Sequence, residues 1–338
     1  MIETPTLSVF GAGSWGTALA ILAARNGCQT LLWGHNEAHM QLLQKDRQNR
    51  QFLPGLHFPE ALQVTSNLEQ AARFSSLFLI SVPSHAFKET IVKLKPFVTA
   101  QTMVTWATKG FNPENGALLD QIVSQILSPT IPMAALSGPS FAFEVASDLP
   151  TAITIASTRN ELADYLAEIL HNPRFRAYTN NDIIGVQVGG AVKNVLAIAA
   201  GIADGLGFGA NTRAALITRG LTEIIRLGLK LGGKQETFMG LAGLGDLILT
   251  CTDNQSRNRR YGLALGKGQE PSRAIQEIGQ EIEGILAAKE TYLLAQKHHI
   301  DMPITEQTYK VLYENLPPLE AVQNLLNRDQ KPESNTWL

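Results

Sequence analysis

Two ionisable side chains stand alone in apolar surroundings, where a charged group needs a partner. Lys193 is the only charged residue between Ile183 and Ala203, and a lysine is rarely buried unless it is paired. Asp246 is isolated in the same way within FMGLAGLGDLILTCT. Burial lowers the proton affinity of an ammonium and a nearby carboxylate restores it, so the two residues together would make a poised acid or base. A purely structural buried ion pair is the alternative.

Glycines and an amide near these two residues favour the catalytic interpretation. Asn194 follows Lys193 directly and adds a polar side chain to the same apolar segment. Glycine allows a ligand or another backbone to come close, and the sequence places glycines beside both charges, at Gly189, Gly190, Gly243 and Gly245.

Two segments of the first half end in residues that would face a ligand. Lys109 follows the strand-like run TMVTWAT, and Gly138 and Ser140 follow MAAL. Ligands of open α/β sheets bind outside the carboxyl ends of the strands. We therefore expect Lys109 to meet an anionic substrate, with a solvated loop lysine as the alternative. Ser140 is expected to cap the next helix, whose free amides would bind an anion.

The segment SRNRR has the composition of a phosphate site. Ser256 is expected to start a helix whose first amides, together with the Arg257 guanidinium, would bind a phosphate dianion. Asn258 lies in the same first turn. The alternative is a solvated basic helix face, which we expect for at least one of the three arginines because successive helical positions point in different directions.

The stretch VFGAGSWGTALA has the glycine spacing of a dinucleotide-binding turn. It follows an apolar strand and opens a helix, which is the context that the motif requires. Gly11 would make the tight turn, Gly13 would let the backbone approach a pyrophosphate, and Gly16 would allow close helix packing. Ser14 and Trp15 would lie beside the pyrophosphate. A glycine-rich turn that binds nothing is the alternative.

The end of the second strand indicates which dinucleotide is accepted. NAD-selective sites usually place a carboxylate there for the ribose 2′-hydroxyl, whereas this chain has His35 and Asn36. NADP is therefore acceptable unless Glu37 turns inward. An exposed loop histidine is the alternative interpretation of His35.

The elements that must position these residues change in character near residue 180. Before it, β-rich runs alternate with helical stretches, which predicts a Rossmann-type doubly wound parallel sheet. After it, amphipathic helical patterns dominate. We expect a dinucleotide-binding domain over residues 1–181 and an all-helical substrate domain over 182–338, with a frayed tail at 330–338. The expected strands are Thr6–Phe10, Gln29–Trp33, Ser76–Val82, Thr102–Thr108, Ile131–Leu136 and Thr151–Ser157.

Composition excludes several classes of protein. A net charge of −2 over 338 residues gives no basic field for nucleic acid. Two cysteines cannot make a disulfide framework, and the N-terminus lacks the basic start of a signal peptide, so we expect a cytoplasmic protein. The apolar segment Ile183–Ala203 is expected to be a buried helix and not a membrane span, because Lys193 at its centre would cost about 3 kcal/mol to insert. The histidines lack metal-ligand spacing.

Over nearly its whole length the chain resembles bacterial NAD(P)-dependent sn-glycerol-3-phosphate dehydrogenases. The matching segments are GAGSWGTALA, WATKG, SGPSFAFEV, IGVQVGGAVKNVLAIAAGIADGLGFGAN, GLAGLGDLILTCTDNQSRNRRYG and MPITEQTYKVLY. The resemblance implies reduction of dihydroxyacetone phosphate to sn-glycerol 3-phosphate with NAD(P)H, for glycerophospholipid synthesis. Some members have an arginine beside the histidine at the 2′-phosphate, where this chain has Asn36, so the preference between NADP and NAD stays open.

The resemblance also implies roles for single residues. It assigns Lys193 as the general acid/base, with Asp246 beside it. Substrate contacts are implied for Lys109, Gly138, Ser140, Lys193, Asn194, Asp246, Ser256, Arg257 and Asn258. Cofactor contacts, besides the three glycines of the turn, are implied for Ser14, Trp15, His35, Lys109, Ala142, Arg257, Glu281 and Glu283.

Two other classes of protein remain as alternatives. A β-hydroxyacid dehydrogenase of similar architecture would need a carboxylate clamp in place of the SRNRR phosphate site. A non-catalytic NADP-binding sensor would have no reason to isolate Lys193 and Asp246 in apolar surroundings. A homodimer is expected from the helical half.

Overall fold

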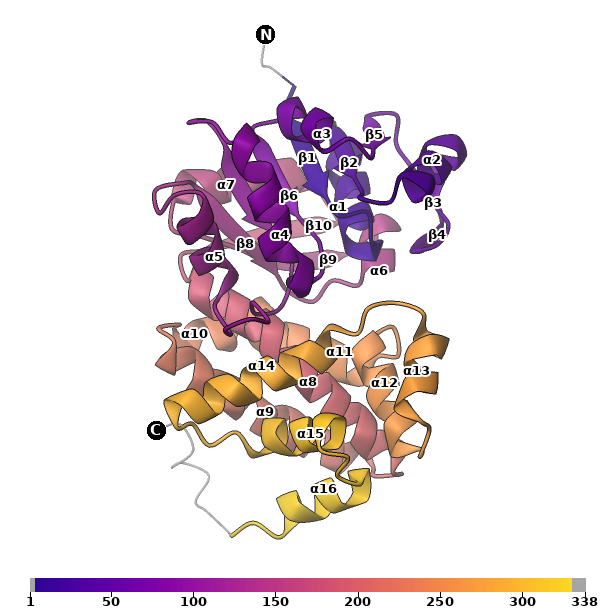
Figure 1. Ribbon diagram of the computed structural model, residues 1–338, viewed down its shortest axis with the longest axis vertical. Coiled ribbons are helices and arrows are strands. Elements are labelled where there is room, and N and C mark those ends of the chain that lie inside the picture. Colours follow the sequence, from indigo (N-terminus) through magenta and orange to yellow (C-terminus); the bar gives the residue numbers. More distant parts are fainter. Residues whose placement is uncertain (1–3, 330–338) are drawn as a thin grey trace. The chain divides into compact units, whose positions relative to one another are not determined.

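The computed structural model describes residues 4–329 and divides into two units. The first unit comprises the chain up to Thr108 together with Leu119–Ile183; the second comprises Lys109–Leu118 and the chain from Ile184. Figure 1 shows their elements, coloured along the sequence. The tail at 330–338, which was expected to fray, lies outside the described residues.

The first unit is built on an eight-stranded sheet of order β10-β9-β8-β7-β6-β1-β2-β5. Its strands are β1 (Thr6–Phe10), β2 (Gln29–Trp33), β5 (Leu62–Thr65), β6 (Leu77–Ile80), β7 (Met103–Trp106), β8 (Met133–Ser137), β9 (Thr151–Ser157) and β10 (Phe175–Asn180). All neighbours pair in parallel except β8 and β9, which are antiparallel. The predicted doubly wound sheet is confirmed, with one reversal where the connection carries only a short helix.

Helices cover both faces of this sheet. Helix α1 packs against α6 and α7, whereas α4 packs against α5. The bounds are α1 (Ser14–Arg25), α2 (Glu37–Asp46), α3 (Leu68–Phe74), α4 (Ser84–Leu94), a 3₁₀ turn (Lys95–Phe97), α5 (Leu119–Ile126), α6 (Ala142–Ala146) and α7 (Asn160–Leu170). A separate hairpin of β3 (Gln48–Asn49) and β4 (Leu53–His57) lies between α2 and β5 in the sequence.

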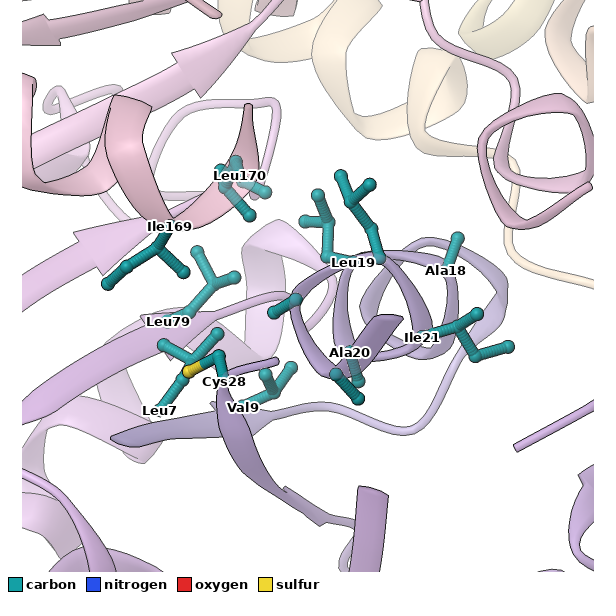
Figure 2. Close-up of a cluster of buried hydrophobic side chains, with 14 of the residues drawn as sticks. Leu7, Val9, Ala18, Leu19, Ala20, Ile21, Cys28, Leu79, Ile169 and Leu170 are labelled. Carbon is teal, nitrogen blue, oxygen red and sulfur yellow. The ribbon is translucent and has the colours of Figure 1, made fainter. Parts of the chain in front are cut away.

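The core of this unit follows from the alternation along β1. Leu7 and Val9 point to one face, where Figure 2 shows them with Leu19 of α1 and Leu79 of β6. Ser8 lies on the opposite face and donates its hydroxyl to the Ala71 carbonyl of α3 at 2.6 Å. The period of two thus places the β1 side chains alternately on the two faces of the sheet.

The elements of the second unit are all helical, as expected from the amphipathic patterns. They are α8 (Ile183–Gly205), α9 (Ala210–Lys230), α10 (Gln235–Phe238), a π-helical segment (Leu241–Gly245), α11 (Asp246–Thr252), α12 (Arg257–Gly266), α13 (Pro271–Ile278), α14 (Glu283–His298), α15 (Pro303–Tyr313) and α16 (Pro318–Leu326). Their apolar faces enclose a core around α8 that also takes in Phe111 and Leu118.

Helix α8 is long and apolar enough to cross a membrane, with a mean hydropathy of 1.6 over its most apolar window. Yet 94% of that window is buried within the protein. This is the pattern of a core helix, as predicted for Ile183–Ala203.

Candidate active site

Helix α8 places Lys193 in the core of the helical unit. The residue is 7% exposed, and its neighbours along the helix, Val192 and Val195, are fully buried. An ammonium in such a place is tolerated only with hydrogen-bonding partners of opposite charge.

Asp246 supplies that partner from the first residue of α11. The Lys193 Nζ donates to Asp246 Oδ1 at 2.5 Å and to Thr250 Oγ1 at 2.8 Å. Asp246 and Thr250 are one turn apart on α11, so both face the same side. The predicted contact between Lys193 and Asp246 is present. Thr250 was not predicted, and its spacing of four from Asp246 is the signal that would have found it.

Lys109 completes the cluster from the segment after β7. Its Nζ donates to Asp246 Oδ2 at 2.6 Å, and its side chain is 16% exposed. The solvated loop lysine is therefore wrong for Lys109. One carboxylate holds two ammonium groups, one on each oxygen, so the cluster has a net charge of +1 when all three groups are ionised.

Close packing of two backbones brings the cluster together. A Cβ on Gly189 would lie 2.5 Å from the carbonyl oxygen of Ala242. Gly189 and Ala242 each precede a charged residue by one helical turn, so this contact sets the separation of Lys193 and Asp246. The sequence left open whether these glycines allow a ligand or another backbone to come close. Gly189 allows the close approach of a backbone, and so does Gly243, which packs against the backbone of Phe238.

Electrostatics makes Lys193 a titratable acid near neutral pH. Burial lowers the pKa of its ammonium to about 8, against the opposing attraction of Asp246, and the charge of Lys109 lowers it further. Burial alone would raise the pKa of Asp246, but the two ammonium groups outweigh burial and hold that pKa below its ordinary value. Asp246 therefore remains a carboxylate while Lys193 can gain and lose a proton.

An amide pair links α8 to α12 and α14. Asn258 Nδ2 donates to Asn194 Oδ1 at 3.0 Å, and Asn258 Oδ1 accepts from the Gly284 amide at 2.9 Å. Both asparagines are buried. The link fixes Asn194, one residue after Lys193, relative to the start of α12.

The start of α12 has the features predicted for a phosphate site. Ser256 is its N-cap, and the hydroxyl accepts from the Arg259 amide at 3.2 Å, which confirms the predicted helix start. Arg257 donates to Gln280 Oε1 at 3.4 Å. Burial lowers the pKa of Arg257, and the charges of Glu283 and Glu281 oppose that shift, so all three predicted residues are electrostatic neighbours.

The other two arginines of SRNRR have different surroundings. Arg259 is buried and donates to Asp204 Oδ2 at 2.5 Å and to the Cys251 carbonyl at 3.0 Å. Arg260 is exposed. The expectation that at least one arginine lies on a solvated face is confirmed at Arg260, whereas Arg259 belongs to the core.

The glycine-rich turn of the first unit has the expected geometry. Gly11 has φ +122°, and a Cβ there would lie 2.4 Å from the Ser81 carbonyl oxygen. A Cβ on Gly16 would collide with the Gly11 carbonyl, whereas one on Gly13 would meet nothing within 4 Å. The structure thus needs glycine for packing at two positions and leaves open space at the third, where a ligand was expected.

The helix that follows the turn is free of a side-chain cap. Helix α1 begins at Ser14 with Gly13 as its N-cap and no capping side chain. Ser14 donates its hydroxyl to the Phe52 carbonyl at 2.7 Å. Among residues 4–329, the buried Trp15 Nε1 has no hydrogen-bond partner. Uncapped amides and an unpartnered indole N–H fit a ligand that accepts hydrogen bonds.

The residues after β2 lie at the surface. His35, Asn36 and Glu37 are exposed, and Asn36 is the N-cap of α2, where its side chain accepts from the His39 amide. Glu37 accepts from Gln41 at 3.3 Å. Within residues 4–329, the Glu37 carboxylate makes no hydrogen bond or ion pair with His35.

The predicted cap at Ser140 is wrong. Helix α6 begins at Ala142 with Phe141 as its N-cap, and Ser140 instead donates to the Gly138 carbonyl at 2.9 Å. Gly138 has φ +143°, so this turn bends the chain back and places Ser140 one residue too early for the cap. Gly138, Ser140 and Ala142 nevertheless lie together after β8, as the sheet argument predicts.

Two family models together match almost all of the described chain. The N-terminal part of the NAD-dependent glycerol-3-phosphate dehydrogenases matches residues 6–163, and their C-terminal part matches residues 182–323. The chain belongs to this family.

Curated glycerol-3-phosphate dehydrogenases match along nearly their full length. The chain is 55% identical to the glycerol-3-phosphate dehydrogenase [NAD(P)+] of Aeromonas hydrophila over 98% of this chain and 100% of that protein. It is 56% identical to the enzyme of that name from Pseudoalteromonas translucida, over 98% and 99% of the two chains. The crystal structure of glycerol-3-phosphate dehydrogenase from Coxiella burnetii has a TM-score of 0.94 at 50% identity and covers 96% of this chain and 99% of that one.

Membership of the glycerol-3-phosphate dehydrogenase family agrees with the resemblance drawn from the sequence. The structure brings one set of predicted residues together within the helical unit: Lys109, Lys193, Asn194, Asp246, Ser256, Arg257, Asn258, Glu281 and Glu283. The remainder lie on the sheet unit, around the glycine-rich turn and after β2 and β8.

Proposed function

We propose that this chain exchanges a hydride between NAD(P)H and dihydroxyacetone phosphate, giving sn-glycerol 3-phosphate for glycerophospholipid synthesis. It is an oxidoreductase of the NAD(P)-dependent glycerol-3-phosphate dehydrogenase family. The observation that carries the assignment of residues is the buried cluster of Lys193, Asp246 and Lys109.

Lys193 is the proposed general acid. NAD(P)H bound at the glycine-rich turn would supply the hydride to the C2 carbon, and the electron pair of the carbonyl bond would move to oxygen. The Lys193 ammonium stabilises this developing alkoxide and transfers a proton to it, so the residue ends neutral and is reprotonated from solvent. In the reverse direction neutral Lys193 removes that proton. Asp246 holds the Nζ in place throughout.

The start of α12 is the proposed substrate phosphate site. Its first amides, the Arg257 guanidinium and the Asn258 amide supply donors and positive charge. Binding the phosphate away from C2 positions the reacting carbon without opposing the chemistry. Gly138, Ser140, Lys109 and Asn194 are proposed as further substrate contacts.

The glycine-rich turn is the proposed pyrophosphate site. Gly11, Gly13 and Gly16 with the first residues of α1, Ser14 and Trp15, fit a dinucleotide because the helix amides are uncapped and Gly13 faces open space. His35 is proposed to meet the ribose 2′-position. Ala142, Lys109, Arg257, Glu281 and Glu283 are the other proposed cofactor contacts.

Three broader properties are proposed with the same function. We propose a dinucleotide-binding domain over residues 1–181 and a substrate domain over residues 182–338. The segment Lys109–Leu118 packs with the helical unit and is assigned to the substrate domain on that ground. The protein is proposed to be a cytoplasmic homodimer. Light scattering would test the oligomer, since a particle of one chain mass would contradict it.

A single substitution tests the assignment of Lys193. Lys193→Met keeps the apolar stem and leaves Asp246 paired with Lys109, so the fold should persist. We expect NADPH binding to be retained while kcat for dihydroxyacetone phosphate falls about a hundredfold to ten-thousandfold. NADPH oxidation is followed by absorbance, with Lys230→Met, an exposed lysine at the end of α9, as the control. A parent that binds NADPH but turns over no substrate would favour the non-catalytic sensor.

A further inference from the structure

Asn49 is a fully buried asparagine beside the glycine-rich turn. It ends β3 in the hairpin of β3 and β4, and its exposed fraction is 0%. Asparagine is usually at the surface, and a buried amide must be fully hydrogen-bonded to be tolerated.

Every hydrogen-bonding position of the Asn49 side chain is used. Nδ2 donates to the Ala12 carbonyl at 3.0 Å and to Thr17 Oγ1 at 2.8 Å. Oδ1 accepts from the Phe52 amide at 3.1 Å and lies 3.2 Å from His39 Nε2. Because a carbonyl only accepts and a backbone amide only donates, these contacts fix the orientation of the side-chain amide.

A second bond ties the hairpin to the helix that begins at the turn. The Ser14 hydroxyl donates to the Phe52 carbonyl at 2.7 Å, so Phe52 is linked to Asn49 through its amide and to α1 through its carbonyl. The His39 ring also packs edge-on against the Phe52 ring, with centroids 5.3 Å apart. Asn49 thus lies at the centre of a network that joins the turn, α1, the hairpin and α2.

The bond to Ala12 has a direct consequence for the amide of Gly13. The Ala12 carbonyl and the Gly13 N–H belong to one planar trans peptide unit and point in opposite directions. Holding the oxygen therefore aims the N–H away from Asn49. Gly13 is the N-cap of α1 and the position with open space in front of it.

We propose that Asn49 is a positioning residue for the dinucleotide pyrophosphate, acting through the Ala12–Gly13 peptide unit. The inference rests on the proposed cofactor site at the glycine-rich turn. Asn49 orients the Gly13 amide before the cofactor arrives, so the reorganisation needed for binding is small. It takes no part in the chemistry at C2, and its effect is confined to cofactor affinity.

Asn49→Asp tests this with no change of shape. The variant loses both donors and sets a carboxylate oxygen against the Ala12 carbonyl, which must turn away. We expect the Kd of NADPH, measured by fluorescence titration without substrate, to rise about tenfold or more. The affinity for ADP, which carries the pyrophosphate but no nicotinamide, should fall similarly. At saturating NADPH, kcat and the KM for dihydroxyacetone phosphate should stay within about twofold of the parent.

Three further variants separate positioning from stability. Asn172→Asp makes the same change at another hydrogen-bonded asparagine of the sheet unit, one that accepts from the Arg174 and Phe175 amides. Thr17→Val removes the second acceptor of Asn49 and leaves the Ala12 bond. Both should lower Tm with NADPH affinity unchanged. The side chain in Asn49→Ser is too short for its hydroxyl to reach the Ala12 carbonyl, so this variant should also weaken NADPH binding. It replaces Asn49→Asp as the test variant if Asn49→Asp does not fold.

The outcomes distinguish this inference from the proposed function. Folded Asn49→Asp that binds NADPH as tightly as the parent would overturn the inference and leave the dehydrogenase assignment intact. Equal weakening in Thr17→Val or Asn172→Asp would also overturn it, because the effect would then follow stability alone. A parent that binds neither NADPH nor NADH would overturn both.

Discussion

At the scale of single residues, the Asp246 carboxylate controls the protonation of Lys193 in the cluster of Lys193, Asp246 and Lys109. Asp246 accepts from Lys193 on one oxygen and from Lys109 on the other. It therefore compensates two buried or half-buried ammonium groups and keeps Lys193 protonated despite burial. Removal of its charge would leave both cations without compensation in an apolar site.

The pH dependence of ketone reduction should report the pKa of Lys193. The acid form is required, and burial sets that pKa at about 8, so kcat/KM for dihydroxyacetone phosphate should be level below about pH 7 and fall above about pH 8. Asp246→Asn removes the attraction that raises this pKa, so the falling limb should move to lower pH. Steady-state rates across this range provide the measurement, and a limb that stays in place would contradict the coupling.

At the scale of elements, the approach of α8 to the π-helical segment sets the spacing within the cluster. Gly189→Ala would place a Cβ 2.5 Å from the Ala242 carbonyl oxygen and force the two backbones apart. We expect destabilisation of about 1–3 kcal/mol and a loss in kcat/KM of about tenfold to a hundredfold, because Asp246 moves away from Lys193. Denaturant unfolding and steady-state kinetics measure the two effects.

Gly209→Ala is the matched control for this change. A Cβ at Gly209, the N-cap of α9, would meet nothing within 4 Å, and the backbone there is extended. The cost should stay below about 1 kcal/mol with full activity. Equal damage in both variants would mean that close packing at Gly189 has no special role.

The sequence predicts the interior elements better than those at the edges of the sheet. The apolar runs at β1, β2 and β6 to β9 match the expected strands because each lies between two neighbours and is buried. Strands β5 and β10 lie at the two edges of the sheet. Their residues are largely polar and partly exposed, so the sequence lacks the alternation of apolar and polar residues that predicts a strand. The cluster of Lys193 and Asp246 is predictable from isolated charges. Asn49 is not, because its role depends on bonds to residues 32 and 37 positions away.

For the whole molecule, two buried carboxyls make stability depend on pH. Burial raises the pKa of both Glu223 and Glu290 to about 7. Glu223 accepts three hydrogen bonds at the start of α15, whereas Glu290 accepts one, from the Phe111 amide at 3.4 Å. Among residues 4–329, the other Glu290 oxygen has no partner.

Glu290→Gln should therefore stabilise the protein at alkaline pH. The folded state binds the Glu290 proton more tightly than the unfolded state, so its penalty is absent below about pH 4.5 and grows as pH rises through about 7. We expect the variant to gain about 1–3 kcal/mol over the parent at about pH 8 and nothing at about pH 4.5. Urea unfolding at both pH values measures this, with exposed Glu277→Gln as the control. A gain that is equal at both pH values would indicate packing and not ionisation.

The segment Lys109–Leu118 belongs to the helical unit although it interrupts the chain of the sheet unit. During synthesis it leaves the ribosome well before α8 to α15, against which Phe111 and Leu118 are finally buried. These two apolar side chains stay exposed to solvent until about the second half of the chain has been synthesised. Lys109 likewise meets Asp246 only after 137 more residues have been joined. The order of translation thus makes completion of the cluster a late event in the synthesis of the chain.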